Sequence, residues 1–279
     1  MIISYKKRSI ICLLFLFYFI KKSDIIIENE IIKNANDKFL VMDLNYINSL
    51  KKLVYTINFG NYDLIRKINK EKGFDYFIFV DQYNETYNDT NWTIILIPEE
   101  VRNLNLSIIK KQRFIKTHPH LFFPNYNLSI YIDGTYQIYG NLSEFLLRIL
   151  TPNLSIYILE HPERRKVNTE ISLVKILKKD YVDNLMKIKE RYKNENFPDN
   201  GGLVESCLII RMHNDETCIN IMKDWFFQIE HYSHRDQLSF NYILWKSKKK
   251  VKYLSKQFCF QYLGGDYIHK KRMVFENSK

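Results

Sequence analysis

The chain has 279 residues, of which 46% are hydrophobic and 26% are charged. This composition excludes collagen, mucin-like stalks and a wholly disordered chain. Four cysteines are too few for a disulfide-dense scaffold, and we expect those beyond the amino-terminal segment to be buried core thiols. The formal net charge is +11, but no dense Arg-rich tract accompanies it, so we expect no nucleic-acid partner.

The amino terminus has the pattern of a membrane anchor. Basic residues at 6–8 precede an apolar run at 9–20, and no small-residue cleavage site follows. The pattern predicts an uncleaved signal anchor over 1–23, with a buried core helix as the alternative. The basic leading flank predicts a cytoplasmic amino end and a lumenal remainder, which is the topology of a single-pass type II protein of the Golgi or secretory pathway. Three glycosylation sequons between residues 84 and 93 favour the same location.

The remainder of the chain divides into a stem or linker at 24–50 and a predicted catalytic domain at 51–279. Apolar, β-rich runs predict strands at 53–57, 74–80, 92–97, 128–132, 155–159 and 203–211. Helical spacing predicts helices at 99–117, 170–194, 216–231 and 235–246. Strands that alternate with helices predict an α/β fold with a mostly parallel central sheet, whose ligands bind beyond the carboxyl ends of the strands.

Carboxylates follow two of these predicted strands. Asp81 ends the second, and Asp133 ends the fourth, where Gly134 comes directly after it. A carboxylate in this position is suited to a divalent cation such as Mn²⁺ or Mg²⁺ that also bridges to substrate phosphates. Asp133 is the residue that we expect to bind the metal. The alternative is an ordinary Asp-Gly turn.

Basic and histidine side chains are the other candidates for chemistry. Arg113 and Lys116 are three residues apart on a predicted helix, so they lie on one face and are suited to neutralising phosphate oxygens. A solvated basic face is the alternative. His161 follows the fifth strand among acidic neighbours, which suits a base, a sugar-hydroxyl ligand or a surface ion-pair cluster. Asp236 is suited to capping a helix or to hydrogen bonding with a sugar.

Taken in order, the motifs of this chain resemble one known family. They lie at 58–63, 79–81, 113–120, 130–134, 161–164, 200–203, 211–213 and 235–240. The segment from about residue 53 to 245 resembles the glycosyltransferase-like family that includes plant mucilage-related proteins and a plant alkaline ceramidase. The resemblance implies a GT-A-like, Rossmann-like nucleotide-sugar fold, a nucleotide-sugar donor and a glycan, protein or lipid acceptor.

The resemblance also assigns roles to individual residues. It places Asp236 and His161 on the donor or acceptor side, and we predict from their chemistry that they are catalytic, with one of them positioning or deprotonating an acceptor hydroxyl. We expect the donor and its nucleotide to be bound by Asp81, Arg113, Lys116, His120, Asp133 and Gly134. We expect the acceptor or sugar to be bound by Arg164, Asn200, Gly201, Arg211, His213, Arg235 and Gln237.

One departure from the family pattern concerns the metal. Many GT-A enzymes carry Asp-x-Asp, whereas Asp133 is followed here by Gly134 and Thr135, so only the first carboxylate is present. Either Thr135 or water completes the coordination shell of the metal, or the dependence on metal is weak. The main hypothesis is a lumenal glycosyltransferase in which a cation, Arg113 and Lys116 stabilise the leaving phosphate. The alternatives are an amide hydrolase that acts on a membrane sphingolipid and a non-catalytic sugar-binding module.

Overall fold

The computed structural model describes residues 43–265. The predicted anchor over 1–23 lies outside these residues. Within the described part of the chain, no helix is both long and apolar enough to cross a membrane. The segment expected to be a linker contributes a short helix, α2 (Leu44–Ser49), whose Ile47 is fully buried.

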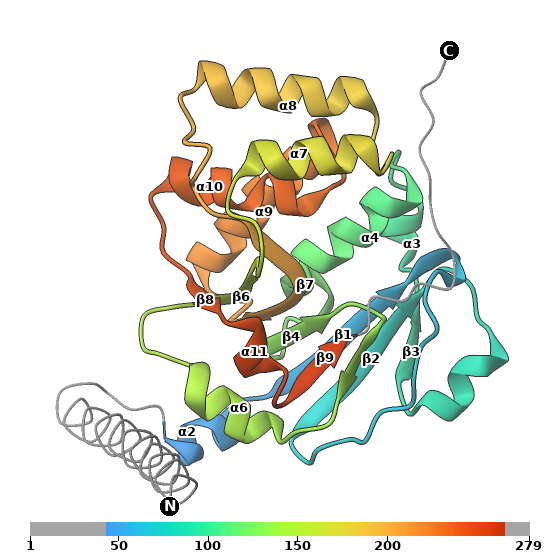
Figure 1. Ribbon diagram of the computed structural model, residues 1–279. Helices are drawn as coiled ribbons and strands as arrows, with labels where there is room; N and C mark the ends of the chain where they lie inside the picture. The colour runs from blue at the N-terminus through green and yellow to red at the C-terminus, as the bar shows by residue number, and fades with distance from the viewer. Residues whose placement is uncertain (1–42, 266–279) are drawn as a thin grey trace, which may run out of the picture. The chain divides into compact units, whose positions relative to one another are not determined.

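A seven-stranded sheet in the order β3-β2-β1-β4-β7-β6-β8 forms the centre of the fold (Figure 1). Its strands are β1 (Lys52–Asn58), β2 (Phe74–Val80), β3 (Thr93–Leu96), β4 (Leu128–Ile132), β6 (Ile156–Glu160), β7 (Val204–Arg211) and β8 (Lys252–Leu254). Strand β7 is antiparallel to both of its neighbours, and every other pair in this sheet is parallel. The predicted α/β fold with a mostly parallel sheet is therefore confirmed. Strands β5 (Tyr136–Ile138) and β9 (Leu263–Gly265) form a separate antiparallel pair.

The helices agree with the sequence prediction in part. They are α3 (Glu99–Arg102), α4 (Ile108–Thr117), α5 (Pro119–Phe122), α6 (Leu142–Ile149), α7 (Val167–Ile176), α8 (Val182–Asn194), α9 (Glu216–His231), α10 (Phe240–Ser247) and α11 (Lys256–Cys259). Short 3-10 turns span Phe59–Asn61, Glu85–Thr90 and Asp236–Leu238.

Three predicted helices were wrong as continuous elements. The one at 235–246 is a 3-10 turn at Asp236–Leu238, followed by α10 from Phe240. The segment at 99–117 breaks because Ser107 caps a new helix, accepting a hydrogen bond from the backbone N–H of Lys110. The segment at 170–194 breaks because Lys178 adopts a positive φ of 47°, which an α-helix does not accommodate. Helix α6 was not predicted, although Asn141 caps it through the N–H of Glu144 and its apolar side chains recur at helical spacing.

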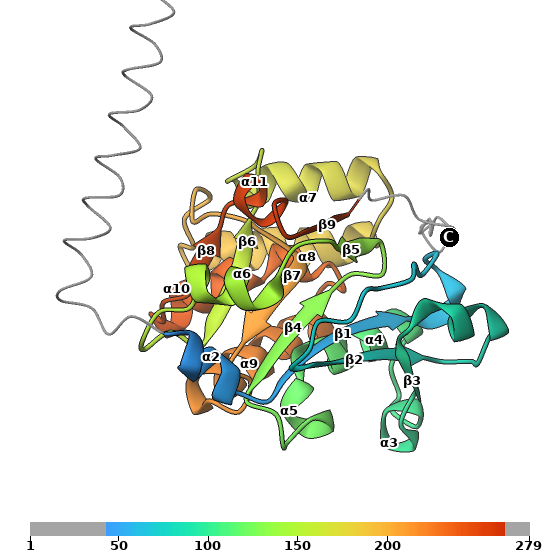
Figure 2. The ribbon, with the colours of Figure 1, turned by 90° about the horizontal axis from the view of Figure 1, so that it is seen from below.

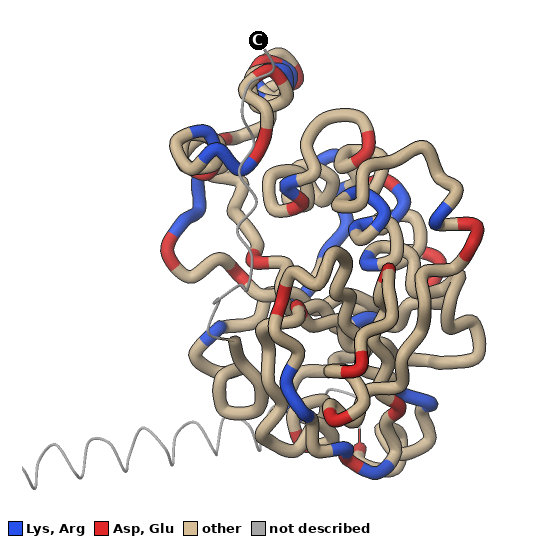
Figure 3. Tube along the Cα trace, turned by 90° about the vertical axis from the view of Figure 1, so that its right-hand side faces the viewer, with Lys and Arg blue, Asp and Glu red and all other residues tan. Residues whose placement is uncertain are grey.

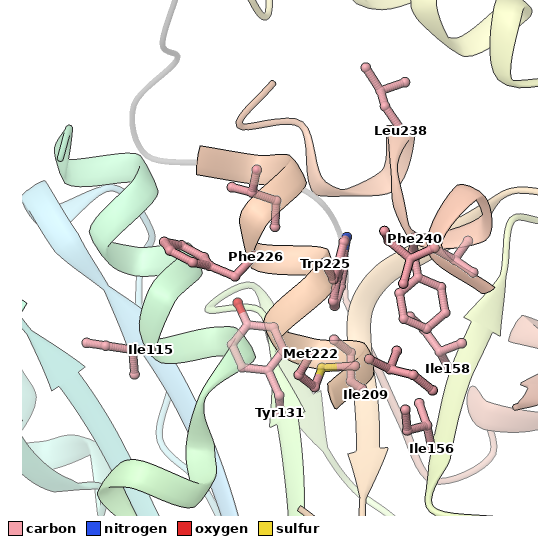
Figure 4. Close-up of a cluster of buried hydrophobic side chains, with 14 of the residues drawn as sticks. Ile115, Tyr131, Ile156, Ile158, Ile209, Met222, Trp225, Phe226, Leu238 and Phe240 are labelled. Atoms are coloured by element: carbon pink, nitrogen blue, oxygen red, sulfur yellow. The ribbon is translucent and has the colours of Figure 1, made fainter. Parts of the chain in front are cut away.

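Helices cover both faces of the sheet (Figures 1 and 2). On one face, residues of α4, α7, α8, α9 and α10 pack with β-strand side chains in a single apolar cluster. Figure 4 shows the middle of this cluster, where Tyr131 lies with Met222, Phe226 and Ile115. The opposite face carries α6 and the β5–β9 pair. Cys207, Cys218 and Cys259 are buried free thiols, as expected.

The reversed direction of β7 matters for the site. Its first residue, Val204, faces Glu160 at the end of β6, and the end of β4 at Ile132 faces Leu208 in the middle of β7. The start of β7 therefore lies at the same edge of the sheet as the carboxyl ends of its antiparallel neighbours, β4 and β6. This is the edge at which ligands bind in open α/β sheets.

Candidate functional site

A cavity of about 600 Å³ opens at this edge of the sheet. Segments that follow β1, β4 and β6, the start of β7, and helices α4 and α7 contribute to its wall. The predicted site residues that line it are Arg113, Lys116, Asp133, His161, Arg164, Arg235, Asp236 and Gln237. Acidic and basic side chains both occur in the wall, and Figure 3 shows the same interspersion along the described chain. The volume suits a ligand of nucleotide or sugar size.

Asp236 joins two cations at the floor of the cavity. Its Oδ2 lies 2.6 Å from Lys116 Nζ and 3.2 Å from Arg113 Nε. Lys116 also donates to Ser206 Oγ at 3.1 Å, and its side chain is 1% exposed. Burial raises the pKa of Asp236, but the charges of Arg113 and Lys116 outweigh it and hold that pKa well below its usual range. A carboxylate held ionised in this way is a poor base, so the geometry gives Asp236 the task of positioning the two cations.

Residues outside the cavity fix the backbone of Lys116. Its backbone carbonyl accepts hydrogen bonds from the Tyr55 hydroxyl at 2.9 Å and from Arg211 Nη1 at 2.8 Å. Arg211 is fully buried, and His213 donates from Nε2 to the Phe123 carbonyl at 2.9 Å. These two residues, which we expected on the acceptor side, do not reach the cavity. They hold the end of α4 and the segment that follows it.

Asp133 and Asp63 line the cavity from loops after β4 and β1. The Tyr131 hydroxyl donates to Asp133 Oδ1 at 2.6 Å, which orients that carboxylate. Gly134 lies against Asp63, because a Cβ placed on it would come 2.7 Å from Asp63 Oδ2. The glycine therefore permits the close approach of the two loops that carry these carboxylates.

A hard divalent cation bound in this cavity would take these carboxylates as ligands, with its remaining ligands from water and substrate phosphates. Within residues 43–265, no three His, Cys, Asp or Glu side chains gather in a group able to hold a metal ion. A metal at Asp133 would therefore depend on the substrate for much of its coordination shell.

His161 is held in one orientation by its own loop. Its Nδ1 accepts hydrogen bonds from the backbone N–H groups of Glu163 and Arg164, at 3.2 and 3.0 Å. Nδ1 is therefore the unprotonated nitrogen, and Nε2 carries the proton of the neutral ring. Burial, reinforced by the charge of Arg164, lowers the pKa of His161. The ring is thus built to donate a hydrogen bond to a ligand rather than to act as the base that we predicted. Arg164 itself pairs with Glu170 at 2.6 Å.

The other predicted site residues lie outside the cavity wall. Asp81 accepts a hydrogen bond from the backbone N–H of Gly60 at 2.9 Å, which fixes the turn after β1. The carbonyl of Gly201 accepts from Asn241 Nδ2 at 3.1 Å, so it anchors helix α10. Asn200 is exposed, and His120 is half-buried in the short helix α5.

Arg235 is the cation with the clearest capacity for a ligand. Its Nη2 donates to Gln237 Oε1 at 3.2 Å, but its Nε is buried without a hydrogen-bond partner. A buried donor without a partner is costly, so this group is suited to an anionic ligand.

Several residues of the wall were missed by sequence reasoning. Asp63 lay within a motif after the first strand, but no charge pattern singled it out. Ser206 lies inside β7, and His234 precedes the recognised Arg-Asp-Gln motif. The apolar part of the wall comes from α4 and α7, through Ile108, Ile109, Leu173, Val174 and Leu177.

Comparison with known proteins identifies the family of this chain. The model of a family described as "TOD1/MUCI70, glycosyltransferase-like domain" matches residues 26–262. The chain belongs to this family. The resemblance seen in the sequence motifs is thereby confirmed, and with it the glycosyltransferase-like character of the domain.

Individual relatives are more distant. A protein of Arabidopsis thaliana named "Probable hexosyltransferase MUCI70" is 28% identical over 152 residues, which is 50% of this chain and 25% of that protein. The chain thus spans about a quarter of that relative's length. Among solved structures, the WbbM bifunctional glycosyltransferase has a TM-score of 0.43 at 17% identity, over 74% of this chain and 39% of the other. Mouse xyloside xylosyltransferase 1 has a TM-score of 0.46 at 12% identity, over 73% and 85%.

Proposed function

We propose that this chain transfers a sugar from a nucleoside-diphosphate donor to a hydroxyl acceptor. Membership of a glycosyltransferase-like family supports the reaction class. The name of the Arabidopsis relative favours a hexose as the transferred sugar. The observation that carries the proposal is the cationic floor of the cavity, where Arg113 and Lys116 share one carboxylate and Arg235 presents a buried N–H without a partner.

The chemistry follows from where charge develops. When the bond from the sugar to the diphosphate breaks, negative charge grows on the leaving phosphate. Lys116 and Arg113 are already held in place by Asp236, so they stabilise that charge without reorganising. Arg235 adds hydrogen bonds from a guanidinium, whose planar geometry suits phosphate oxygens.

Asp133 and Asp63 are the residues that would hold a divalent cation. The cation would supply further neutralisation of the diphosphate. His161 and Gln237 face the same cavity, and Gln237 also donates to the carbonyl of Val204 at 3.2 Å. His161 Nε2–H and the Gln237 amide are suited to hydrogen bonds with sugar hydroxyls.

The cavity wall offers the amide hydrolase hypothesis no reactive cysteine nucleophile. Cys207 is the cysteine in the cavity wall, but burial raises the pKa of its thiol well above the usual value. Its Sγ also lies 2.9 Å from the Tyr136 hydroxyl. A buried, protonated thiol of this kind is a poor nucleophile.

The first test is thermal unfolding of the full chain with UDP and with GDP, each with and without Mn²⁺. A ligand at 100 times its dissociation constant stabilises the fold by about 2.7 kcal/mol, which is easily seen as a shift in Tm. We expect a shift with one nucleotide that depends on Mn²⁺ and is lost in Asp133→Ala. Donor turnover is then measured with the matching UDP-hexose or GDP-hexose. No shift with either nucleotide would contradict the proposal.

A further inference from the structure

A transfer to a hydroxyl group requires a proton acceptor, and the two candidates expected from the sequence do not fit that task. Asp236 is neutralised by two cations, and its pKa is held low. The Nδ1 of His161 is occupied by two backbone N–H groups. Another side chain of the same cavity, His234, has the arrangement that a base needs.

His234 pairs with a fixed carboxylate through one edge of its ring. Its Nδ1 lies 3.4 Å from Asp180 Oδ2, and the Asp180 side chain is fully buried. The same oxygen accepts a hydrogen bond from Ser233 Oγ. The other oxygen, Oδ1, accepts from the backbone N–H of Tyr181 at 2.7 Å and from Asn184 Nδ2 at 3.2 Å.

These contacts hold Asp180 ionised and immobile. Burial raises its pKa, but hydrogen bonds from His234, Ser233 and Asn184 outweigh it, so the pKa of Asp180 is lowered. An ionised carboxylate beside Nδ1 keeps the proton of the neutral imidazole on that nitrogen. It therefore makes Nε2, on the opposite edge of the ring, the basic nitrogen. It also stabilises the imidazolium that forms when Nε2 takes up a proton.

We propose that His234 is the general base of the transfer reaction and that Asp180 is its positioning residue. This inference rests on the proposed function. As the acceptor oxygen forms its bond to the anomeric carbon of the sugar, its proton passes to His234 Nε2. The bond from that carbon to the diphosphate oxygen breaks, and its electron pair leaves with the diphosphate. The proton on Nδ1 stays in the hydrogen bond to Asp180.

The arrangement is local and specific. Ser233, His234 and Asp236 lie within four residues of one another, in the segment between α9 and α10. Ser233 Oγ also accepts from the backbone N–H of Arg235 at 3.1 Å. One short segment thus carries the cation that faces the diphosphate, the carboxylate that holds two further cations, and the proposed base.

The test compares His234→Gln with the matched control His231→Gln in the full chain. His231 lies at the exposed end of α9, outside the cavity wall. With UDP-hexose or GDP-hexose, whichever the thermal unfolding test selects, and a hydroxyl acceptor, we expect kcat of His234→Gln to fall by at least about 100-fold. This is the usual scale of general-base catalysis. The KM for the donor and the nucleotide-induced shift in Tm should stay within about threefold of wild type, since His234 does not hold the diphosphate. His231→Gln should behave as wild type.

Two further measurements separate a base from a structural residue. Asp180 is ion-paired with the ring, and the charged side chains of Lys179, Arg235 and Asp236 line the same cavity. The acidic limb of the pH profile of kcat should disappear in His234→Gln if the base itself is lost. Asp180→Asn should lower kcat with an unchanged donor KM. In His234→Ala, added imidazole should restore part of the rate.

The outcomes distinguish the two proposals. Wild-type protein without any sugar transfer overturns the proposed function and this inference with it. A wild-type enzyme that transfers sugar, together with a His234→Gln variant of unchanged kcat and unchanged pH profile, overturns the inference alone. A rate loss in His234→Ala that imidazole does not relieve, with kcat and donor KM both altered, assigns His234 a structural role instead.

Discussion

Lys116 and Asp236 form an ion pair at 2.6 Å that is almost wholly shielded from water. Arg113 shares the same carboxylate oxygen at 3.2 Å, so two positive charges meet one negative charge at the floor of the cavity. Burial lowers the pKa of Lys116 in spite of its pairing with Asp236. With Lys116 protonated, the three side chains carry one net positive charge in a region where Coulomb interactions are poorly screened. That charge is a fixed attraction for an anionic ligand, and each member of the cluster can be tested separately.

Replacement of Asp236 should be costly to the fold. In Asp236→Asn, two buried cations lose their counter-charge, and we expect the free energy of unfolding to fall by about 3–5 kcal/mol. Urea denaturation followed by tryptophan fluorescence measures this loss. Asp224→Asn, on the exposed side of α9, is the control and should change stability by less than about 0.5 kcal/mol. Adding Lys116→Met should restore part of the stability, and a strictly additive double variant would contradict the coupling.

Replacement of Arg235 should weaken donor binding with little effect on stability. Its buried Nε has no partner within the described protein, so the fold loses little when it is removed. A hydrogen bond to a charged group contributes about 1.5–3 kcal/mol, so Arg235→Gln should raise the Kd for the nucleotide by roughly 10- to 100-fold. Isothermal titration calorimetry measures this change. Arg102→Gln, exposed at the end of α3, serves as the control. An unchanged Kd in Arg235→Gln would rule out its contact with the diphosphate.

Asp133 should govern the cation dependence of nucleotide binding. Asp133→Asn keeps the shape of the side chain but removes the charge that a hard cation prefers. We expect the Mn²⁺-dependent part of the nucleotide-induced shift in Tm to disappear, while the cation-independent part remains. Asp81→Asn is the informative comparison, because Asp81 lies outside the cavity wall and bonds to Gly60. If Asp81→Asn lost the Mn²⁺-dependent part of the Tm shift to the same extent, Asp81, directly after β2, would belong to the nucleotide site.

Acid should destabilise the fold through two buried histidines. Burial lowers the pKa of His118 and of His213 from 6.5 to about 4. The unfolded chain therefore binds protons between pH 6.5 and 4 that the folded chain does not. Stability is fully present above this window and falls as the pH drops through it, by up to about 3 kcal/mol for each histidine.

Urea denaturation at intervals of half a pH unit measures how steeply the free energy of unfolding falls with pH. His118→Asn should be less stable than wild type at neutral pH but should show a shallower loss between pH 6.5 and 4. His231→Gln, which changes an exposed histidine, should keep the wild-type slope. If the free energy of unfolding of His118→Asn fell with pH as steeply as that of wild type, groups other than His118 would cause the loss of stability in acid.

The sequence predicted the strands well because their apolar runs are long and bounded by turn residues. The predicted runs at 74–80 and 128–132 coincide with β2 and β4. The three-residue strands β5, β8 and β9 were missed, since periodicity has no length over which to show itself in them. The break between α7 and α8 was missed because it depends on a positive φ at Lys178. Lysine adopts a positive φ only rarely, so the residue type does not predict the break.

The site was predictable where its residues belong to one motif and not where distant segments meet. Arg113, Lys116 and Asp133 were found from the helical spacing and the strand end. Asp180 precedes β7 and α9 in the sequence and His234 follows them, so no local sequence pattern predicts that the two residues pair. Arg211 was expected to bind a ligand, but its burial beneath α4 became visible only when the sheet was assembled.

Arg211 also has a consequence for motions of the native protein. It bridges β7 to the Tyr55 hydroxyl of β1 and to the last turn of α4 through the Lys116 carbonyl. The carboxyl end of a helix commonly frays, with local opening that leaves the rest of the fold intact. Here that opening would break contacts to two central strands at once. Backbone amides of the last turn of α4 should therefore exchange with deuterium as slowly as those of the central strands, in the same cooperative unit.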